Sequence, residues 1–253
     1  IGVGIVVIGK KEKIMIDTAT KDIAMNFIIP YLNKLGISII NKILLTHGDH
    51  DHIGGVCSFQ EIFKPKILAS KLTEEYSKDP VTAFNKRFRW LLDYLSDEQK
   101  SDLLNSYFNE RGEGFLIDEY LYDDLVIEID SHKFNVINMD GHIDGALGFY
   151  EKDLKLLICG DSIQGQGVYS QQFTPFPMYD NVRKYLATLK RLKMMDLNIL
   201  VCAHPYLPFH NPIINGKEIE YFLDKSIESV ETITKLVLEG VSIGKNTLKE
   251  IAN

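Results

Sequence analysis

Short apolar runs alternate with longer amphipathic stretches along most of this chain. The short runs are rich in Ile, Val and Leu and are bounded by Gly, Asp or Asn, which is typical of β-strands. They predict strands at residues 5–8, 13–16, 43–46, 66–69, 125–129, 133–138, 146–150, 154–158 and 199–202. The longer stretches predict helices at residues 21–35, 74–95, 97–109, 182–194 and 219–239. The alternation of the two predicts an α/β protein in which helices cover the sheets.

Local signals refine the ends of these helices. Ser96 and Gln99 have the spacing of a capping box, which predicts that a helix begins directly after Ser96. Pro30 and Pro80 should each kink a helix or move its boundary, because proline has no backbone N–H to donate. No internal repeat or low-complexity linker divides the chain, so we expect one domain over residues 1–253.

Composition narrows the class of protein. The chain has 253 residues, of which 45% are hydrophobic, enough to bury one sizeable core. The net charge of −7 argues against nucleic acid as a partner. No apolar run reaches the ~18 residues that a membrane helix needs, and no signal segment opens the chain, so we expect a cytoplasmic protein without a membrane partner. The three widely spaced cysteines fit reduced, packed side chains better than disulfides.

The richest chemistry lies in the segment from Thr46 to Gly55, directly after a predicted strand. It places five possible metal ligands within six residues, namely His47, Asp49, His50, Asp51 and His52. Imidazole and carboxylate groups this close together suit zinc, iron or manganese. The segment therefore predicts a metal site.

Three further candidate ligands each follow another predicted strand: His142, Asp161 and His204. Strand ends are held firmly by the sheet, and the loops after them can direct side chains to one point. We therefore expect these residues to converge with the first cluster at one rim of the fold.

The pattern His47-x-Asp49-x-Asp51-His52, followed by His142, Asp161 and His204, resembles the motif series of the metallo-β-lactamase superfamily. The resemblance covers about residues 1–210 and implies a four-layer αββα sandwich. It also implies two divalent metal ions, zinc foremost, with iron or manganese as alternatives. The first metal would take His47, Asp49 and His142, the second would take Asp51, His52 and His204, and Asp161 would bridge them.

Asp49 departs from the common family pattern, in which this position is often His. A carboxylate is a harder ligand than imidazole, which moves metal preference toward iron or manganese. His50 is offset by one residue, and we favour a role for it outside the ligand set. Asp17 could orient a ligand imidazole from behind, or could simply end a strand.

The stretch between His52 and His142 contains a predicted helical cap at about residues 71–114. Apolar residues at helical spacing, such as Phe84, Phe88 and Leu91, should pack onto the sandwich. The basic residues Lys86, Arg87 and Arg89 could steer an anionic substrate, although a solvated helix face is the more common case. The glycine-rich segment that begins at Gln164 and continues into the aromatic loop at residues 168–179 should form a wall of the pocket. Tyr169 or Tyr179 could serve there as an oxyanion donor, and nothing in the spacing selects between them.

The leading functional hypothesis is a metal-dependent hydrolase of a small ester, lactone, thioester or amide. By resemblance, a metal-bound hydroxide oriented by the catalytic Asp51 would attack the substrate. An iron-dependent oxidoreductase of the same fold and a small-phosphodiester hydrolase are the alternatives. The sequence names neither the substrate nor the oligomeric state.

Overall fold

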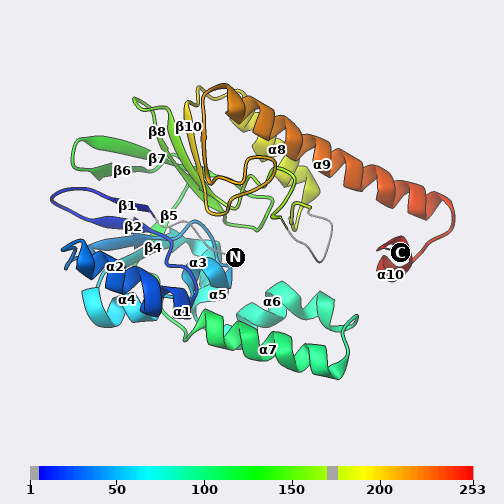
Figure 1. Ribbon diagram of the computed structural model, residues 1–253, viewed down its shortest axis with the longest axis horizontal. Helices are drawn as coiled ribbons and strands as arrows, with labels where there is room; N and C mark the ends of the chain where they lie inside the picture. The colour runs from blue at the N-terminus through cyan, green and yellow to red at the C-terminus, as the bar shows by residue number, and fades with distance from the viewer. Residues whose placement is uncertain (1–5, 170–175, 253) are drawn as a thin grey trace.

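The computed structural model describes residues 6–169 and 176–252 and contains two mixed β-sheets (Figure 1). The first sheet has the strand order β1 (Val6–Ile8), β2 (Ile14–Ile16), β3 (Lys42–Leu44), β4 (Lys66–Ser70) and β5 (Glu119–Leu121). The second has the order β11 (Ile213–Asn215), β10 (Ile199–Cys202), β9 (Leu156–Gly160), β8 (Leu147–Glu151), β7 (His132–Asn138) and β6 (Val126–Ile129). Strands β2 to β5 run parallel to one another, and so do β9 and β10, whereas the other neighbouring pairs are antiparallel.

Helices cover the outer face of each sheet. On the first sheet these are α1 (Lys21–Ile23), the π-helical turn η1 (Ala24–Ile28), α2 (Ile29–Lys34), α3 (His50–Ile53) and α4 (Val56–Phe63). The second sheet is covered by α8 (Val182–Lys193) and α9 (Lys217–Ser242), and α10 (Leu248–Ala252) follows near the carboxyl end (Figure 1). Four layers in the order αββα result, as predicted. No helix of the described residues is long and apolar enough to cross a membrane.

Strand β2 is apolar along its whole length because both of its faces are buried. In β2, Ile14 and Ile16 pack between the sheets, whereas Met15 packs against the helices. Side chains alternate between the two faces of a strand, so β3 and β4 repeat this division, with Leu44 and Leu68 on the inner face. The inner core thus joins the two sheets, and an outer core joins each sheet to its helices.

The elements between β4 and β5 extend beyond the sandwich at one edge (Figure 1). They are the 3₁₀ turn η2 (Lys71–Thr73), α5 (Glu74–Ser77), α6 (Pro80–Leu92) and α7 (Asp97–Arg111). Helices α6 and α7 pack against each other, and α7 also contacts α3, the helix that carries part of the metal motif. The division into one domain with a cap at about residues 71–114 stays a prediction.

Most predicted elements are present, with differences that have local causes. The Ser96–Gln99 capping box forms and begins α7. Pro80 takes the first position of α6, so the helix expected at residues 74–95 is split into α5 and α6. The helix expected at residues 21–35 continues past Pro30, but the turn before this proline is π-helical. Strands β5 and β11 were not predicted, because each is a three-residue strand at a sheet edge.

Arg111 joins the end of α7 to the end of α5. Its side chain is buried and donates hydrogen bonds to the carbonyl oxygens of Tyr76, Ser77 and Glu113, at 2.6, 2.9 and 2.8 Å. Three backbone carbonyls would lose these donors if the guanidinium were removed.

We therefore expect Arg111→Met to lower the free energy of unfolding by about 2–4 kcal/mol. Urea denaturation followed by circular dichroism measures this change. Arg89→Met is the matched control, because Arg89 is exposed on α6 and its loss should change stability by less than about 0.5 kcal/mol. Equal effects of the two substitutions would contradict the role given to Arg111.

Candidate metal centre

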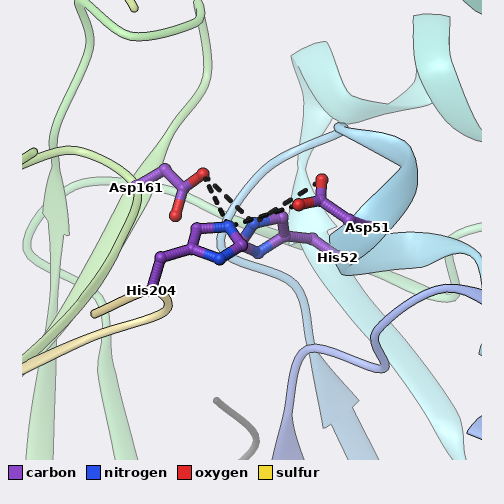
Figure 2. Close-up of side chains that lie close together, drawn as sticks. All are labelled: Asp51, His52, Asp161 and His204. Carbon is purple, nitrogen blue, oxygen red and sulfur yellow. Dashed lines mark ion pairs between the residues drawn. The ribbon is translucent and has the colours of Figure 1, made fainter. Parts of the chain in front are cut away.

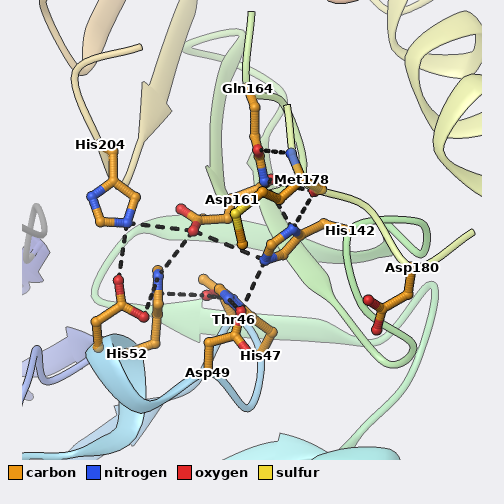
Figure 3. A network of polar contacts seen from close by, with 12 residues as sticks. Thr46, His47, Asp49, His52, His142, Asp161, Gln164, Met178, Asp180 and His204 are labelled. Atoms are coloured by element: carbon orange, nitrogen blue, oxygen red, sulfur yellow. Dashed lines mark hydrogen bonds and ion pairs between the residues drawn. The ribbon is translucent and has the colours of Figure 1, made fainter. Parts of the chain in front are cut away.

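The seven predicted ligands lie together at the sheet edge, in two adjacent groups (Figures 2 and 3). In each group the possible ligand atoms all lie within 4.8 Å of one another. The groups contain His47, Asp49 and His142, and Asp51, His52, Asp161 and His204. The division follows the one that the family resemblance implies, with Asp161 in the second group.

Strand direction explains why residues so distant in sequence meet here. Strands β7 and β9 are both antiparallel to β8, which lies between them, so they run parallel to each other. Strand β10 is parallel to β9, so all three strands run in the same direction. His142, Asp161 and His204 follow these three strands and therefore reach the same edge. The motif after β3 joins them from the first sheet, where the Thr46 carbonyl accepts a hydrogen bond from the Leu147 amide at 2.8 Å.

Two glycines allow the close approach of backbones around this edge. Gly160 ends β9 with a φ of +52°, and a Cβ there would lie 2.6 Å from Thr46 Oγ1. Gly48 separates His47 from Asp49, and a Cβ there would lie 2.5 Å from the ring of Tyr76. A side chain at position 160 would push the two sheets apart, and one at position 48 would push the cap away from the motif.

The second group is built around one carboxylate oxygen (Figure 2). Asp161 Oδ2 lies 3.4 Å from Nε2 of both His52 and His204. Asp51 Oδ2 lies 3.2 Å from His204 Nε2 on the other side. Two imidazoles and two carboxylates thus face one small volume, which is a donor set that suits a divalent metal.

The first group lies on the other side of Asp161. Asp49 Oδ2 lies 3.0 Å from His142 Nε2 and 3.6 Å from His47 Nε2. Asp161 Oδ2 is 4.0 Å from His142 Nε2, so the same oxygen faces both groups. This geometry fits the bridging position that the resemblance implies for Asp161.

Asp17 holds the imidazole of His52 from behind. Its Oδ2 lies 2.9 Å from His52 Nδ1, and its two oxygens accept hydrogen bonds from the backbone and side chain of Thr46 at 2.8 Å. When Nδ1 carries the proton, the lone pair of Nε2 faces Asp161. The Thr46 hydroxyl also lies 2.9 Å from His47 Nδ1, so one buried network orients two imidazoles.

His142 is oriented by the segment that follows Asp161 (Figure 3). Its Nδ1 lies 2.6 Å from the carbonyl oxygen of Met178, which accepts its proton. The side chain of Gln164 holds the backbone of Met178 through two hydrogen bonds. Gln164 Oε1 accepts from the Met178 amide, and Gln164 Nε2 donates to the Met178 carbonyl. Gln164 could not be predicted as a site residue, because its neighbours Gly165 and Gly167 indicate only an irregular loop.

Arg87 corrects the expectation of a solvated basic face on α6. Its side chain is 9% exposed, and its guanidinium lies 2.9 Å from both oxygens of Asp49 and 2.6 Å from Asp180. Because Arg87 lies three residues after the buried Phe84, it shares the apolar helix face of that residue. That position was the signal in the sequence for a buried arginine with an acidic partner.

The three carboxylates of the centre stay ionised although Asp49 and Asp161 are buried and Asp51 is only partly exposed. Burial alone would raise the pKa of Asp49, but Arg87 and the hydrogen bond from His142 hold it well below its usual range. The pKa values of Asp51 and Asp161 are also lowered against burial, mainly by His52 and His204.

The imidazoles of His52 and His204 respond in the opposite sense. Burial lowers the pKa of His204, yet Asp161 and Asp51 raise it to about 10. Asp161, Asp51 and Asp17 likewise hold the pKa of His52 well above its ordinary value against the effect of burial. The concentrated negative charge thus attracts protons, and a divalent cation would satisfy the same charge.

Several buried polar atoms in the centre make no hydrogen bond among the described residues. They are His47 Nε2, His52 Nε2 and Asp161 Oδ1. Leaving such atoms unpaired is costly, and a coordinated metal ion would satisfy them. The residues present therefore fit divalent metal ions.

Other residues weighed from the sequence lie outside the ligand groups. His50 pairs with Glu110 at 3.2 Å and lies beside the ring of Tyr107, so it faces the cap. Cys159 and Cys202 are buried and reduced, with their Sγ atoms 3.6 Å apart. In the aromatic segment, residues 170–175 lie outside the described residues, while Tyr169 is 57% exposed and Tyr179 stacks on Tyr185.

The family profile of the metallo-beta-lactamase superfamily matches residues 2–204 of this chain. The protein therefore belongs to the metallo-beta-lactamase superfamily. Within that family it is an enzyme, a metal-dependent hydrolase, and its cluster of histidines and aspartates suits divalent metal ions.

Curated relatives include two enzymes named for one activity. The hydroxyacylglutathione hydrolase GloC of Haemophilus influenzae is 25% identical over 199 residues, covering 75% of this chain and 82% of the relative. The hydroxyacylglutathione hydrolase of Pectobacterium atrosepticum is 27% identical over 205 residues, covering 78% of this chain but 63% of the relative. Among solved structures, a metallo-beta-lactamase family protein from Thermus thermophilus superposes with a TM-score of 0.68 at 19% identity, covering 94% of this chain and 78% of that one. This superposition supports the fold alone.

We expect Asp17→Asn to weaken metal binding by about 10- to 100-fold, because the amide is a poorer acceptor for the His52 Nδ1 proton than the carboxylate is. Competition with a chromophoric chelator measures the affinity. Asp22→Asn is the control, since Asp22 is exposed on α1. Unchanged affinity in Asp17→Asn would show that the hydrogen bond to His52 does not support metal binding.

Proposed function

We propose that the protein hydrolyses a small ester, lactone, thioester or amide with two divalent metal ions, zinc foremost. His47, Asp49 and His142 would hold one ion, and Asp51, His52 and His204 would hold the other. Asp161 would bridge them. The names of the two hydroxyacylglutathione hydrolases support an acyl substrate, although their identity to this chain is below 30%.

The observation that carries the proposal is the convergence of these donors on a cavity. The cavity has a volume of about 220 Å³ and is lined by members of both groups together with Phe88, Val168 and Tyr206. Apolar walls around polar groups are typical of sites that bind a small organic substrate. Such walls also strengthen the electrostatic interactions inside.

Bound metal ions would supply Lewis acidity, which activates water for attack and polarises the substrate carbonyl. Asp51 is the residue best placed to orient the attacking water and accept its proton, because its side chain is the most exposed of the three carboxylates, at 26%. Asp49 and Asp161 have side chains that are only 10% and 9% exposed, so they would bind the ions rather than contact the substrate. Asp51 is thus the proposed catalytic residue.

An iron-dependent oxidoreductase is the second candidate, favoured by the carboxylate of Asp49 in the first group. Elemental analysis of protein purified without added metal separates the two hypotheses when it is combined with assays. Zinc with hydrolysis of esters or thioesters supports the proposal. Iron with oxygen consumption, and without hydrolysis of esters, thioesters, lactones or small phosphodiesters, would replace it.

We expect Asp51→Asn to lower kcat by at least about 100-fold, because it removes a ligand charge and the proton acceptor together. The fold should persist, since the side chain is polar and partly exposed. Turnover of aryl esters and thioesters, with metal content measured on the same samples, provides the test.

The exposed Asp22→Asn serves as the control and should retain full activity. Wild-type turnover by Asp51→Asn with both ions bound would overturn the role given to Asp51.

A further inference from the structure

A second cavity of about 660 Å³ adjoins the metal centre. It lies between α6 and α9, and the segment at residues 176–180 forms another part of its lining. The cavity that contains the metal ligands shares four lining residues with it: Arg87, Phe88, Phe176 and Met178. A molecule with its reacting group at the metals could therefore extend into this second cavity, which we call the apolar groove.

The apolar groove offers large hydrophobic surfaces to solvent. Trp90 and Leu91 of α6 line it opposite Ile233 of α9. Trp90, Phe176 and Met178 are 58%, 52% and 50% exposed, so most of their apolar area is available for contact. Clustered exposed apolar residues beside a catalytic centre are typical of a ligand-binding groove.

Charge on the groove lining is cancelled internally. Among its described lining residues, Arg87 is the only cation and Asp180 the only anion. The Arg87 guanidinium lies 2.6 Å from Asp180 and also pairs with Asp49. Binding a substrate carboxylate at Arg87 would therefore compete with two ion pairs, and breaking the buried pair with Asp49 is costly. The groove suits an uncharged ligand.

We propose that the substrate carries an uncharged hydrocarbon arm that lies in the apolar groove while its acyl carbon lies at the metal centre. This inference rests on the proposed hydrolase function for the placement of the acyl group. It narrows the substrate class to acyl compounds with an apolar chain or ring, rather than those recognised through carboxylates.

Trp90 is the only tryptophan of the chain, so its fluorescence reports on the groove. The probes are 2-nonanone and 2-butanone, which are uncharged and cannot be hydrolysed. We expect 2-nonanone to shift the Trp90 emission to shorter wavelength, with saturation, and to bind at least about tenfold more tightly than 2-butanone. Equal binding of the two ketones, or no spectral change, would overturn the inference.

Matched variants test whether 2-nonanone binds in the apolar groove. Ile233→Glu and Leu91→Glu each place a charge on one side of the groove and should weaken 2-nonanone binding by at least about tenfold. Leu236→Glu makes the same kind of change on α9 at a residue that is 59% exposed and does not line the groove, and it should bind 2-nonanone like the wild type. Equal weakening by Leu236→Glu would contradict the location.

Hydrolysis distinguishes failure of this inference from failure of the proposed function. Preference for 4-nitrophenyl octanoate over the acetate, lost in Ile233→Glu, supports both. Ketone binding without hydrolysis of any acyl substrate would leave the groove in place and refute the hydrolase proposal. Hydrolysis without chain-length preference and without ketone binding would refute the groove alone.

Discussion

The buried negative charge at the sheet edge is the constraint on which the rest of this structure depends. Asp49 and Asp51 from the segment after β3, and Asp161 from the loop after β9, reach one small volume and remain ionised there. Ionised groups are stable in such a place only when cations or donors surround them. The neighbouring imidazoles, the Arg87 guanidinium and the proposed metal ions all meet this requirement, so the architecture around the edge is organised to balance charge.

Much of this arrangement could be predicted, because its causes are local in the sequence. Ligand residue types directly after apolar strands are visible without coordinates, and parallel strands bring their ends to one edge. The continuous apolar run of β2, from Ile14 to Ile16, likewise indicates a strand buried on both faces. Asp17 could be named as a partner for an imidazole, but only the fold brings it to His52 rather than to another histidine.

Features that depend on packing between distant elements could not be predicted. Strand β5 contains Glu119 and Tyr120 in a three-residue segment, and pairing with β4 rather than hydrophobicity makes it a strand. Arg87 carried a signal, since it shares a helix face with the buried Phe84, but its partner depends on how α6 lies over the motif. Contacts set by tertiary packing override local propensity in this way.

The ion pair between Arg87 and Asp49 connects the metal centre with the cap helix α6 and with the apolar groove. A histidine at position 49 would need no counter-charge, whereas the aspartate draws the arginine of α6 into the edge of the metal centre. That contact anchors the neighbouring Phe88, Trp90 and Leu91 beside the site. The ion pair also occupies the Arg87 guanidinium, which could otherwise bind an anionic substrate. This ion pair thus contributes to the docking of α6, and it leaves a groove in which the described cation is already paired.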